Sequence, residues 1–200
     1  VVFTNKNVTC QYRAVGHPIA VALTEGIVDL AALKLGMDPA EFRRKNLIPD
    51  DAYPYTFPSG IKFEKLSHHK ALDLLLKIMD YDQLRAEQAR LRKEKIYRGI
   101  GLAAMIEVTN PSPAFYGVGG ALYERMVYDE SGQLLNASFM DFLMPYASEV
   151  PHIETDHLET PSPLNPLGLK GAGEAGTIPV SAVIASAIED AEGFPIRSMP

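Results

Sequence analysis

A glycine-rich loop followed by an apolar helix constrains this chain more than any other stretch does. The loop covers residues 168–177, with the sequence GLKGAGEAGT, and it sets one carboxylate, Glu174, among small residues. Glycine tolerates positive φ angles and lets a backbone approach a ligand closely. A helix expected over residues 179–189 would point unpaired N–H groups and a partial positive charge back at the loop. The sequence therefore predicts a place that suits an anion beside Glu174.

The residues alone leave two interpretations of Glu174 open. It can be an ordinary acidic residue whose charge stabilises the dipole of the next helix by about 0.3–1 kcal/mol, or it can be a functional carboxylate. Gly171, Gly173 and Gly176 also satisfy the G-x-G-x-x-G pattern of dinucleotide-binding proteins. That pattern requires a buried strand before it, and the proline-rich run 161–166 is hostile to one. A dinucleotide-binding dehydrogenase is therefore the least favoured interpretation.

Composition excludes several classes of protein. The formal net charge of −6 and the lack of a basic cluster argue against a nucleic-acid or anionic-membrane partner. No apolar run approaches the roughly 20 residues that a membrane-spanning helix needs. A single cysteine, Cys10, excludes an internal disulfide and is typical of a reducing compartment. We therefore expect a cytoplasmic protein without membrane insertion.

Hydrophobic spacing predicts a mixture of helices and strands. Helices are expected over 18–35, 38–46, 66–79, 81–95 and 179–189, strands over 98–108, 133–140 and 153–158, and a loop with short extended pieces over 49–63. Apolar residues surround the first helix broadly, which is typical of a buried helix; they are Ile19, Ala22, Leu23, Ile27, Leu30 and Leu33. Because the elements do not alternate in a strict βαβ rhythm, the predicted class is α+β.

Other polar residues give weaker indications. The five histidines do not have the spacing of a metal site, so we expect no metal bound by protein side chains. Cys10 is interpreted as a small core residue rather than a nucleophile. Arg13 precedes the first helix, and the residues alone are compatible with a loop cation that pairs with a nearby carboxylate.

Several stretches taken together resemble a known family. Those with the clearest match are residues 12–18 (YRAVGHP), 36–46 (GMDPAEFRRKN), 98–102 (RGIGL), 119–124 (GGALYE), 138–141 (SFMD), 157–163 (HLETPSP) and 170–174 (KGAGE). In this order they resemble the large, molybdenum-cofactor-binding subunit of the molybdenum hydroxylases. This group contains xanthine dehydrogenase, aldehyde oxidase and carbon monoxide dehydrogenase. The resemblance implies that the chain is part of the α+β molybdopterin-binding region.

The resemblance also implies residue roles. Glu174 would be the general base beside the molybdenum, and Arg13 would orient the substrate or stabilise developing negative charge. Lys170, Gly171, Ala172 and Gly173 would contact the cofactor, molybdopterin, for which the cytosine dinucleotide is one form. The implied reaction is hydroxylation of an aldehyde or an N-heterocycle with oxygen from water.

One departure bears on the reaction. Carbon monoxide dehydrogenases of the family carry a copper-binding cysteine directly after the arginine, and this chain has Ala14 there. A copper–molybdenum site is therefore not expected.

Family membership implies partner chains as well. The electrons would leave through an iron–sulfur subunit and an FAD-binding subunit, because this chain has no iron–sulfur cysteine pattern. We expect a hetero-oligomer, for which a dimer of heterotrimers is one arrangement.

A further departure concerns length. In the family, a long stretch separates the counterparts of Tyr116 and Ala121, so we expect residues 1–116 and 117–200 to be two parts of the molybdopterin-binding region. The full-length protein would be an enzyme, and the isolated chain would be inactive and hold cofactor poorly. The alternative is a catalytically incompetent fragment that serves as a structural or interaction module of a hydroxylase complex.

Overall fold

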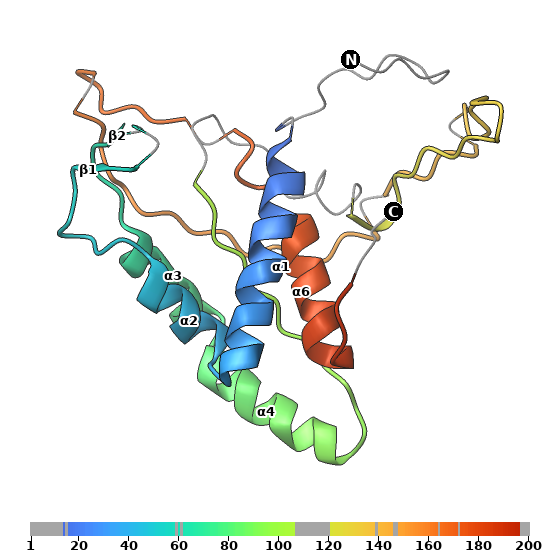
Figure 1. The fold of residues 1–200 in the computed structure, drawn as a ribbon, viewed down its shortest axis with the longest axis horizontal. Helices are drawn as coiled ribbons and strands as arrows, with labels where there is room; N and C mark the ends of the chain where they lie inside the picture. The colour runs from blue at the N-terminus through green and yellow to red at the C-terminus, as the bar shows by residue number, and fades with distance from the viewer. Residues whose placement is uncertain are drawn as a thin grey trace.

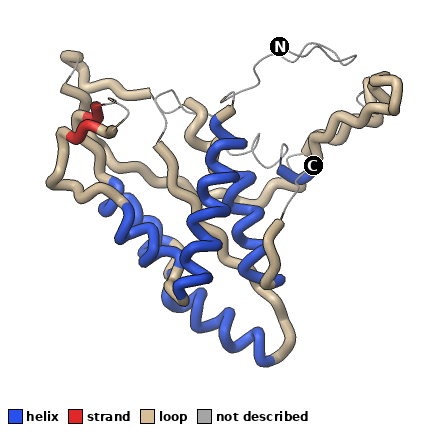
Figure 2. Tube along the Cα trace, viewed as in Figure 1, coloured by secondary structure: helices blue, strands red, loops and turns tan. Residues whose placement is uncertain are grey.

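The computed structural model describes residues 14, 16–58, 60, 62–106, 121–138, 140–145, 148–163, 165–171 and 173–196. Its helices and strands, coloured in Figure 2, are α1 (His17–Leu35), α2 (Pro39–Asn46), β1 (Tyr55–Thr56), β2 (Lys62–Phe63), α3 (His68–Ile78), α4 (Tyr81–Lys93) and α6 (Val180–Glu192). β1 and β2 form a small antiparallel pair. Helices with a small sheet confirm the predicted α+β class.

The helices begin and end where the sequence signals place them. Pro18 lies in the first turn of α1, and Gly36 ends this helix with a left-handed φ of 62°. Asp38 caps α2, since its side chain accepts hydrogen bonds from the backbone N–H groups of Ala40 and Glu41. All five predicted helices are confirmed to within a few residues at their ends.

α1 and α6 lie side by side and run in the same direction (Figure 1), although they are far apart in the sequence. Ser186 of α6 donates a hydrogen bond of 2.5 Å to the Asp29 carboxylate of α1. α4 lies near the C-terminal ends of both helices, where Arg85 pairs with Asp190 of α6 at 3.0 Å. These contacts fix the N-terminal ends of the two helices relative to each other.

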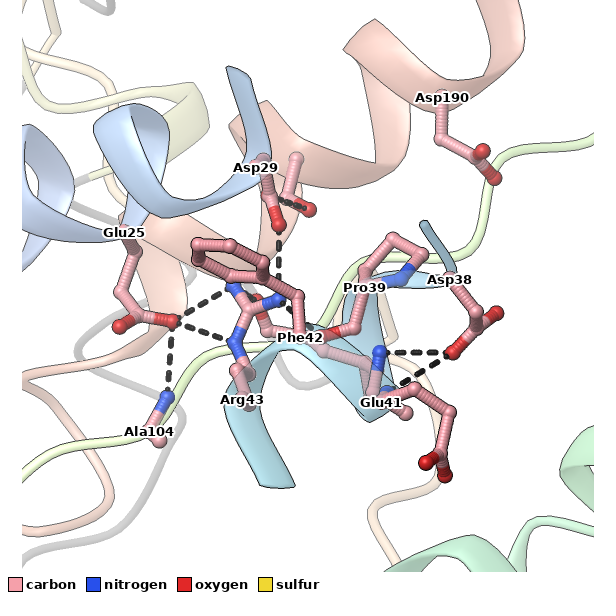
Figure 3. Close-up of polar contacts among 12 residues, drawn as sticks. Glu25, Asp29, Asp38, Pro39, Glu41, Phe42, Arg43, Ala104 and Asp190 are labelled. Carbon is pink, nitrogen blue, oxygen red and sulfur yellow. Dashed lines mark hydrogen bonds and ion pairs between the residues drawn. The ribbon is translucent and has the colours of Figure 1, made fainter. Parts of the chain in front are cut away.

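A buried guanidinium connects α1, α2 and the segment that follows α4. Arg43 of α2 is 4% exposed, and Figure 3 shows it between two carboxylates of α1, Glu25 at 2.7 Å and Asp29 at 2.8 Å. It also donates to the carbonyl oxygen of Leu102 at 2.9 Å. Burial alone would lower the pKa of Arg43, but the two carboxylates more than offset this and raise it. The charged side chain of Arg43 therefore links α2 to α1 and to the segment that follows α4.

The predicted buried strand over 98–108 is wrong as a strand within its described part, 98–106, and the predicted burial is confirmed for Ile100 and Leu102 only. Ile100 and Leu102 are 7% and 4% exposed, but residues 98–106 are extended without a neighbouring strand among the described residues. Side chains from α6 and α1 accept the backbone hydrogen bonds that a neighbouring strand would accept. Asp190 accepts the N–H of Ile100 at 2.8 Å, and Glu25 accepts the N–H of Ala104 at 3.0 Å. The buried backbone groups are therefore satisfied without a sheet.

Glycine is required where this segment crosses α6. A Cβ atom placed on Gly99 would lie 1.6 Å from the carbonyl oxygen of Ala187, which is backbone and cannot move away cheaply. We expect Gly99→Ala to lower the free energy of unfolding by about 1–3 kcal/mol or more, measured by urea unfolding. The matched control is Gly26→Ala in α1, where nothing lies within 4 Å. Equal stability of the two variants would contradict this packing.

Two other strand predictions are wrong. Within the described part of 133–140, pairing is limited to an isolated bridge between Leu134 and Tyr128. Residues 153–158 are exposed and pair with no described strand, although their hydrophobic alternation is typical of one. Alternation requires a partner strand on at least one side, and the described residues provide none in either place.

The predicted burial of the apolar face of α1 is also wrong. The described neighbours cover the side of α1 that carries Glu25 and Ala32, and they leave its large aliphatic residues outside. The exposed residues are Ile19 (68%), Leu23 (65%), Ile27 (67%), Leu30 (45%) and Leu33 (72%). A helix that is apolar on all sides is normally covered on all sides, and α1 is covered on one.

Candidate functional site

The carboxylate of Glu174 lies against the turn that precedes α1. The backbone N–H of Ala14 donates to Glu174 Oε1 at 2.5 Å, across 160 residues of sequence. Ala14 is fully buried and Glu174 is half-buried. The glycine loop therefore meets the residue that directly follows Arg13. Arg13 itself lies outside the described residues.

The backbone of Glu174 starts a turn that leads into α6. Its carbonyl oxygen accepts the N–H groups of Thr177 and Ile178 at 2.9 and 3.0 Å. α6 itself begins at Val180, and its first turn contains no acidic residue. Glu174 is therefore not a first-turn charge of α6, and its side chain is directed to the turn before α1 instead.

Two helix N-termini converge on this place. α1 and α6 run parallel in Figure 1, so both present their N-terminal ends to the segments that contain Ala14 and Glu174. Each N-terminus is equivalent to roughly half a positive charge, which stabilises nearby anions. The electrostatic environment therefore suits a carboxylate and also an anionic ligand beside it.

Hydrogen bonds shape the start of the glycine loop, and two of its glycine amides have no acceptor among the described residues. Asn165 holds Leu169 by two hydrogen bonds, from the Leu169 N–H at 2.8 Å and to its carbonyl oxygen at 2.9 Å. Gly168 takes a φ of 66°, which favours glycine. Gly171 is exposed and Gly173 is half-buried, and within the described part of the chain nothing accepts a hydrogen bond from either amide. Ala172 lies outside the described residues.

The ammonium group of Lys170 already has hydrogen-bond partners within the chain. Its Nζ donates to the carbonyl oxygen of Lys65 at 2.8 Å and to Thr160 Oγ1 at 2.9 Å. Burial lowers the pKa of Lys170, and the nearby charge of Lys65 lowers it further. Lys170 therefore ties the glycine loop to two other segments. Its side chain is already engaged before any ligand is considered.

A separate pocket of about 340 Å³ lies beside α1, at residues 21–28 of the helix. Its apolar lining comes from α1, from Leu47 and from the segment 104–106, and Glu25, Arg43 and His68 are among its polar residues. Glu25 and Arg43 already pair with each other, and neither Glu174 nor the glycine loop lines this pocket. Among the described residues, no three His, Cys, Asp or Glu side chains are grouped to hold a metal ion. Among the described residues, the Glu174 carboxylate and this pocket are therefore separate features of the chain.

Comparison with known proteins identifies a family of relatives. Two models of a molybdopterin cofactor-binding domain match residues 1–47 and 114–151. The gamma subunit of the 6-hydroxypseudooxynicotine dehydrogenase complex from Paenarthrobacter nicotinovorans is 52% identical over 79 residues, 39% of this chain and 10% of that protein. The carbon monoxide dehydrogenase large chain from Hydrogenophaga pseudoflava is 38% identical over 121 residues, 56% of this chain and 15% of that protein. The chain is homologous to the large subunits of molybdenum hydroxylases.

Solved structures share the fold of this chain over about nine-tenths of its length. The chain superposes on quinoline 2-oxidoreductase from Pseudomonas putida 86 with a TM-score of 0.81 at 17% identity, covering 91% of this chain and 50% of that one. The copper- and molybdenum-containing CO dehydrogenase in its carbon monoxide-reduced state gives 0.81 at 16% identity, covering 90% and 50%. The matches to curated relatives span between 9% and 16% of their length. The chain therefore has the fold of part of a hydroxylase large subunit.

Sequence reasoning missed the partner of Glu174. Ala14 was of interest only because it replaces a copper-binding cysteine, whereas the structure shows that its backbone N–H holds the carboxylate. Because every residue except proline carries a backbone N–H, the residue type at position 14 does not indicate that this group is a donor to Glu174. The available signal was the Gly16-His17-Pro18 sequence next to it, which indicates a tight turn directly before α1.

Proposed function

We propose that this chain is the base-bearing part of a molybdenum hydroxylase active site, in which Glu174 is the general base. The observation that carries this proposal is the contact between the Glu174 carboxylate and the turn next to Arg13. It joins the two segments to which the family resemblance assigns base and substrate contact. A half-buried carboxylate in a fixed orientation is well suited to accept a proton from a reacting group.

The residues near Glu174 fit an anionic pterin cofactor. The amides of Gly171 and Gly173 have no acceptor among the described residues, and two helix N-termini favour negative charge nearby. These amides, with Ala172 between them, would hold the cofactor, and Lys170 would fix their loop. When bound, the molybdenum cofactor, with the cytosine dinucleotide as one form, supplies the centre that takes up the two electrons of the oxidation.

The chain's own residues would then act on the substrate and its proton. Arg13 would orient the substrate and offset negative charge that develops on it. Glu174 would accept the proton released when oxygen from water is transferred to an electron-poor carbon. The fixed orientation given by the Ala14 amide would keep the carboxylate ready for this transfer.

An N-heterocycle is the substrate class that we favour over an aldehyde or carbon monoxide. Two relatives with 52% and 40% identity are named for nicotine and a nicotine derivative, 6-hydroxypseudooxynicotine. Ala14 offers no thiol at the position where the family's carbon monoxide dehydrogenases bind copper. These two observations support hydroxylation of an electron-poor ring carbon.

The functional unit would be larger than these residues. Six large aliphatic residues of α1 are 45–72% exposed, which supports further covering structure in the full-length protein. Relatives are named as a gamma subunit and a large subunit, which supports assembly with iron–sulfur and FAD-binding subunits. Residues 1–116 and 117–200 would be two parts of one molybdopterin-binding region, and alone they would be inactive. Among the described helices, none is long and apolar enough to cross a membrane.

The source of the product oxygen tests this function. The full-length protein, purified with its subunits, is given an N-heterocycle such as quinoline and an artificial electron acceptor in H₂¹⁸O or under ¹⁸O₂. We expect mass spectrometry to find ¹⁸O in the hydroxylated product only from labelled water, together with molybdenum in the protein. Label that comes from ¹⁸O₂, or turnover by a preparation free of molybdenum, would contradict the proposal.

A further inference from the structure

The backbone of Ala14 is held on both sides. Its N–H donates to Glu174 Oε1 at 2.5 Å, and its carbonyl oxygen accepts the N–H of His17, the first residue of α1, at 2.9 Å. Its side chain is 0% exposed. The direction of the Ala14 N–H is therefore set by its hydrogen bond to α1 and by the surrounding core.

The backbone conformation of Ala14 is one that alanine rarely adopts. Its φ is 67°, in the left-handed region that residues with a Cβ atom seldom occupy. Such conformations persist where the surroundings hold them, and they concentrate at functional sites. The structure therefore maintains an unfavourable conformation at a residue whose N–H donates to the Glu174 carboxylate.

The backbone of Glu174, the acceptor residue, is also held by hydrogen bonds. The carbonyl oxygen of Glu174 accepts from Thr177 and Ile178, and these two residues are 6% and 0% exposed. The turn leads into α6, which is joined to α1 by the hydrogen bond from Ser186 to Asp29. The packing of α1 on α6 therefore sets the distance between the donor and the carboxylate.

We propose that the backbone amide of Ala14 is the positioning group of the Glu174 base. This inference rests on the proposed function of Glu174 and goes one step beyond it. A carboxylate has about four acceptor positions, so the hydrogen bond from Ala14 can orient the Glu174 carboxylate without removing its capacity to take a proton. The left-handed turn at Ala14 serves to aim this amide.

Replacing the amide by an ester tests the proposal without changing a side chain. Lactic acid in place of Ala14, introduced by nonsense suppression in the full-length protein, deletes only the N–H. A hydrogen bond to a charged group contributes enough that kcat should fall about 10- to 100-fold, with KM and molybdenum content nearly unchanged. Lactic acid in place of Ala20 is the matched control. It deletes an N–H that donates to Gly16 in the exposed first turn of α1, and it should leave kcat nearly unchanged.

A spectroscopic readout separates this inference from the proposed function. With glutamate labelled by ¹³C at the carboxyl carbon, the infrared band assigned to Glu174 by its absence in Glu174→Gln should shift in the Ala14 ester. No shift would overturn the positioning role. A shift without any loss of kcat would overturn Glu174 as the base, and the positioning role with it. Ala14→Gly keeps the N–H and suits the left-handed φ, so it should retain kcat within about twofold; a loss as large as that of the ester would overturn the proposal.

Discussion

Replacing Arg43 by methionine is expected to lower the free energy of unfolding by about 3–5 kcal/mol. The substitution keeps a side chain of similar length but leaves the carboxylates of Glu25 and Asp29 without their cation, 2.7 and 2.8 Å from the lost guanidinium nitrogens. It also leaves the carbonyl oxygen of Leu102 without a donor. Urea unfolding of the purified protein, followed by circular dichroism, measures the loss.

The neighbouring residue provides the control for this prediction. Arg44 pairs with Glu41 and Asp73 on the surface, where its side chain is 29% exposed. Surface pairs contribute about 0–1 kcal/mol, so Arg44→Met should change stability little. Adding Glu25→Gln to Arg43→Met should recover part of the loss, because it removes one unpaired charge. Equal effects of Arg43→Met and Arg44→Met would show that the buried cluster does not hold α1, α2 and the segment 98–106 together.

Replacing Glu174 by glutamine is expected to lower kcat of the full-length protein about 10²- to 10⁴-fold, the usual contribution of a general base. Glutamine has the same shape but cannot accept the proton. It can still accept the hydrogen bond from the Ala14 amide through its side-chain oxygen. The molybdenum content should therefore stay at the wild-type level, and steady-state kinetics together with metal analysis distinguish loss of chemistry from loss of cofactor.

Glu192→Gln is the matched control for the same chemical change. Glu192 is exposed at the C-terminal end of α6, at the opposite end of the helix from Glu174. This variant should have wild-type kcat and molybdenum content. If Glu174→Gln also retained wild-type kcat, Glu174 could not be the base, whatever its contact with Ala14.

The helices could be predicted from the sequence because their signals are local. Pro18, Gly36 and Asp38 each act within one turn of the helix that they begin or end. The position of Glu174 could not be predicted in this way. Its contact with Ala14 spans 160 residues and depends on the packing of α1 against α6, which no local pattern encodes.

The segment 98–106 shows why the strands were harder to predict. An apolar run indicates burial, but a strand also requires a neighbouring backbone. Here Asp190 and Glu25 accept the hydrogen bonds that a second strand would accept. The prediction that the apolar face of α1 is buried was wrong for a related reason. Leu23 and Ile27 are 65% and 67% exposed, since hydrophobic spacing indicates which residues need to be covered but not which segment covers them.

The most direct test of the central claim is whether the Glu174 carboxylate lies beside the molybdenum. The full-length protein is prepared with ¹³C at the carboxyl carbon of glutamate and reduced to the paramagnetic Mo(V) state, and ¹³C electron–nuclear double resonance is recorded. We predict a ¹³C coupling to the metal in the wild-type protein and in Glu192→Gln that disappears in Glu174→Gln. The same coupling in all three proteins, or no coupling in the wild type, would contradict the claim that Glu174 is the base of this site.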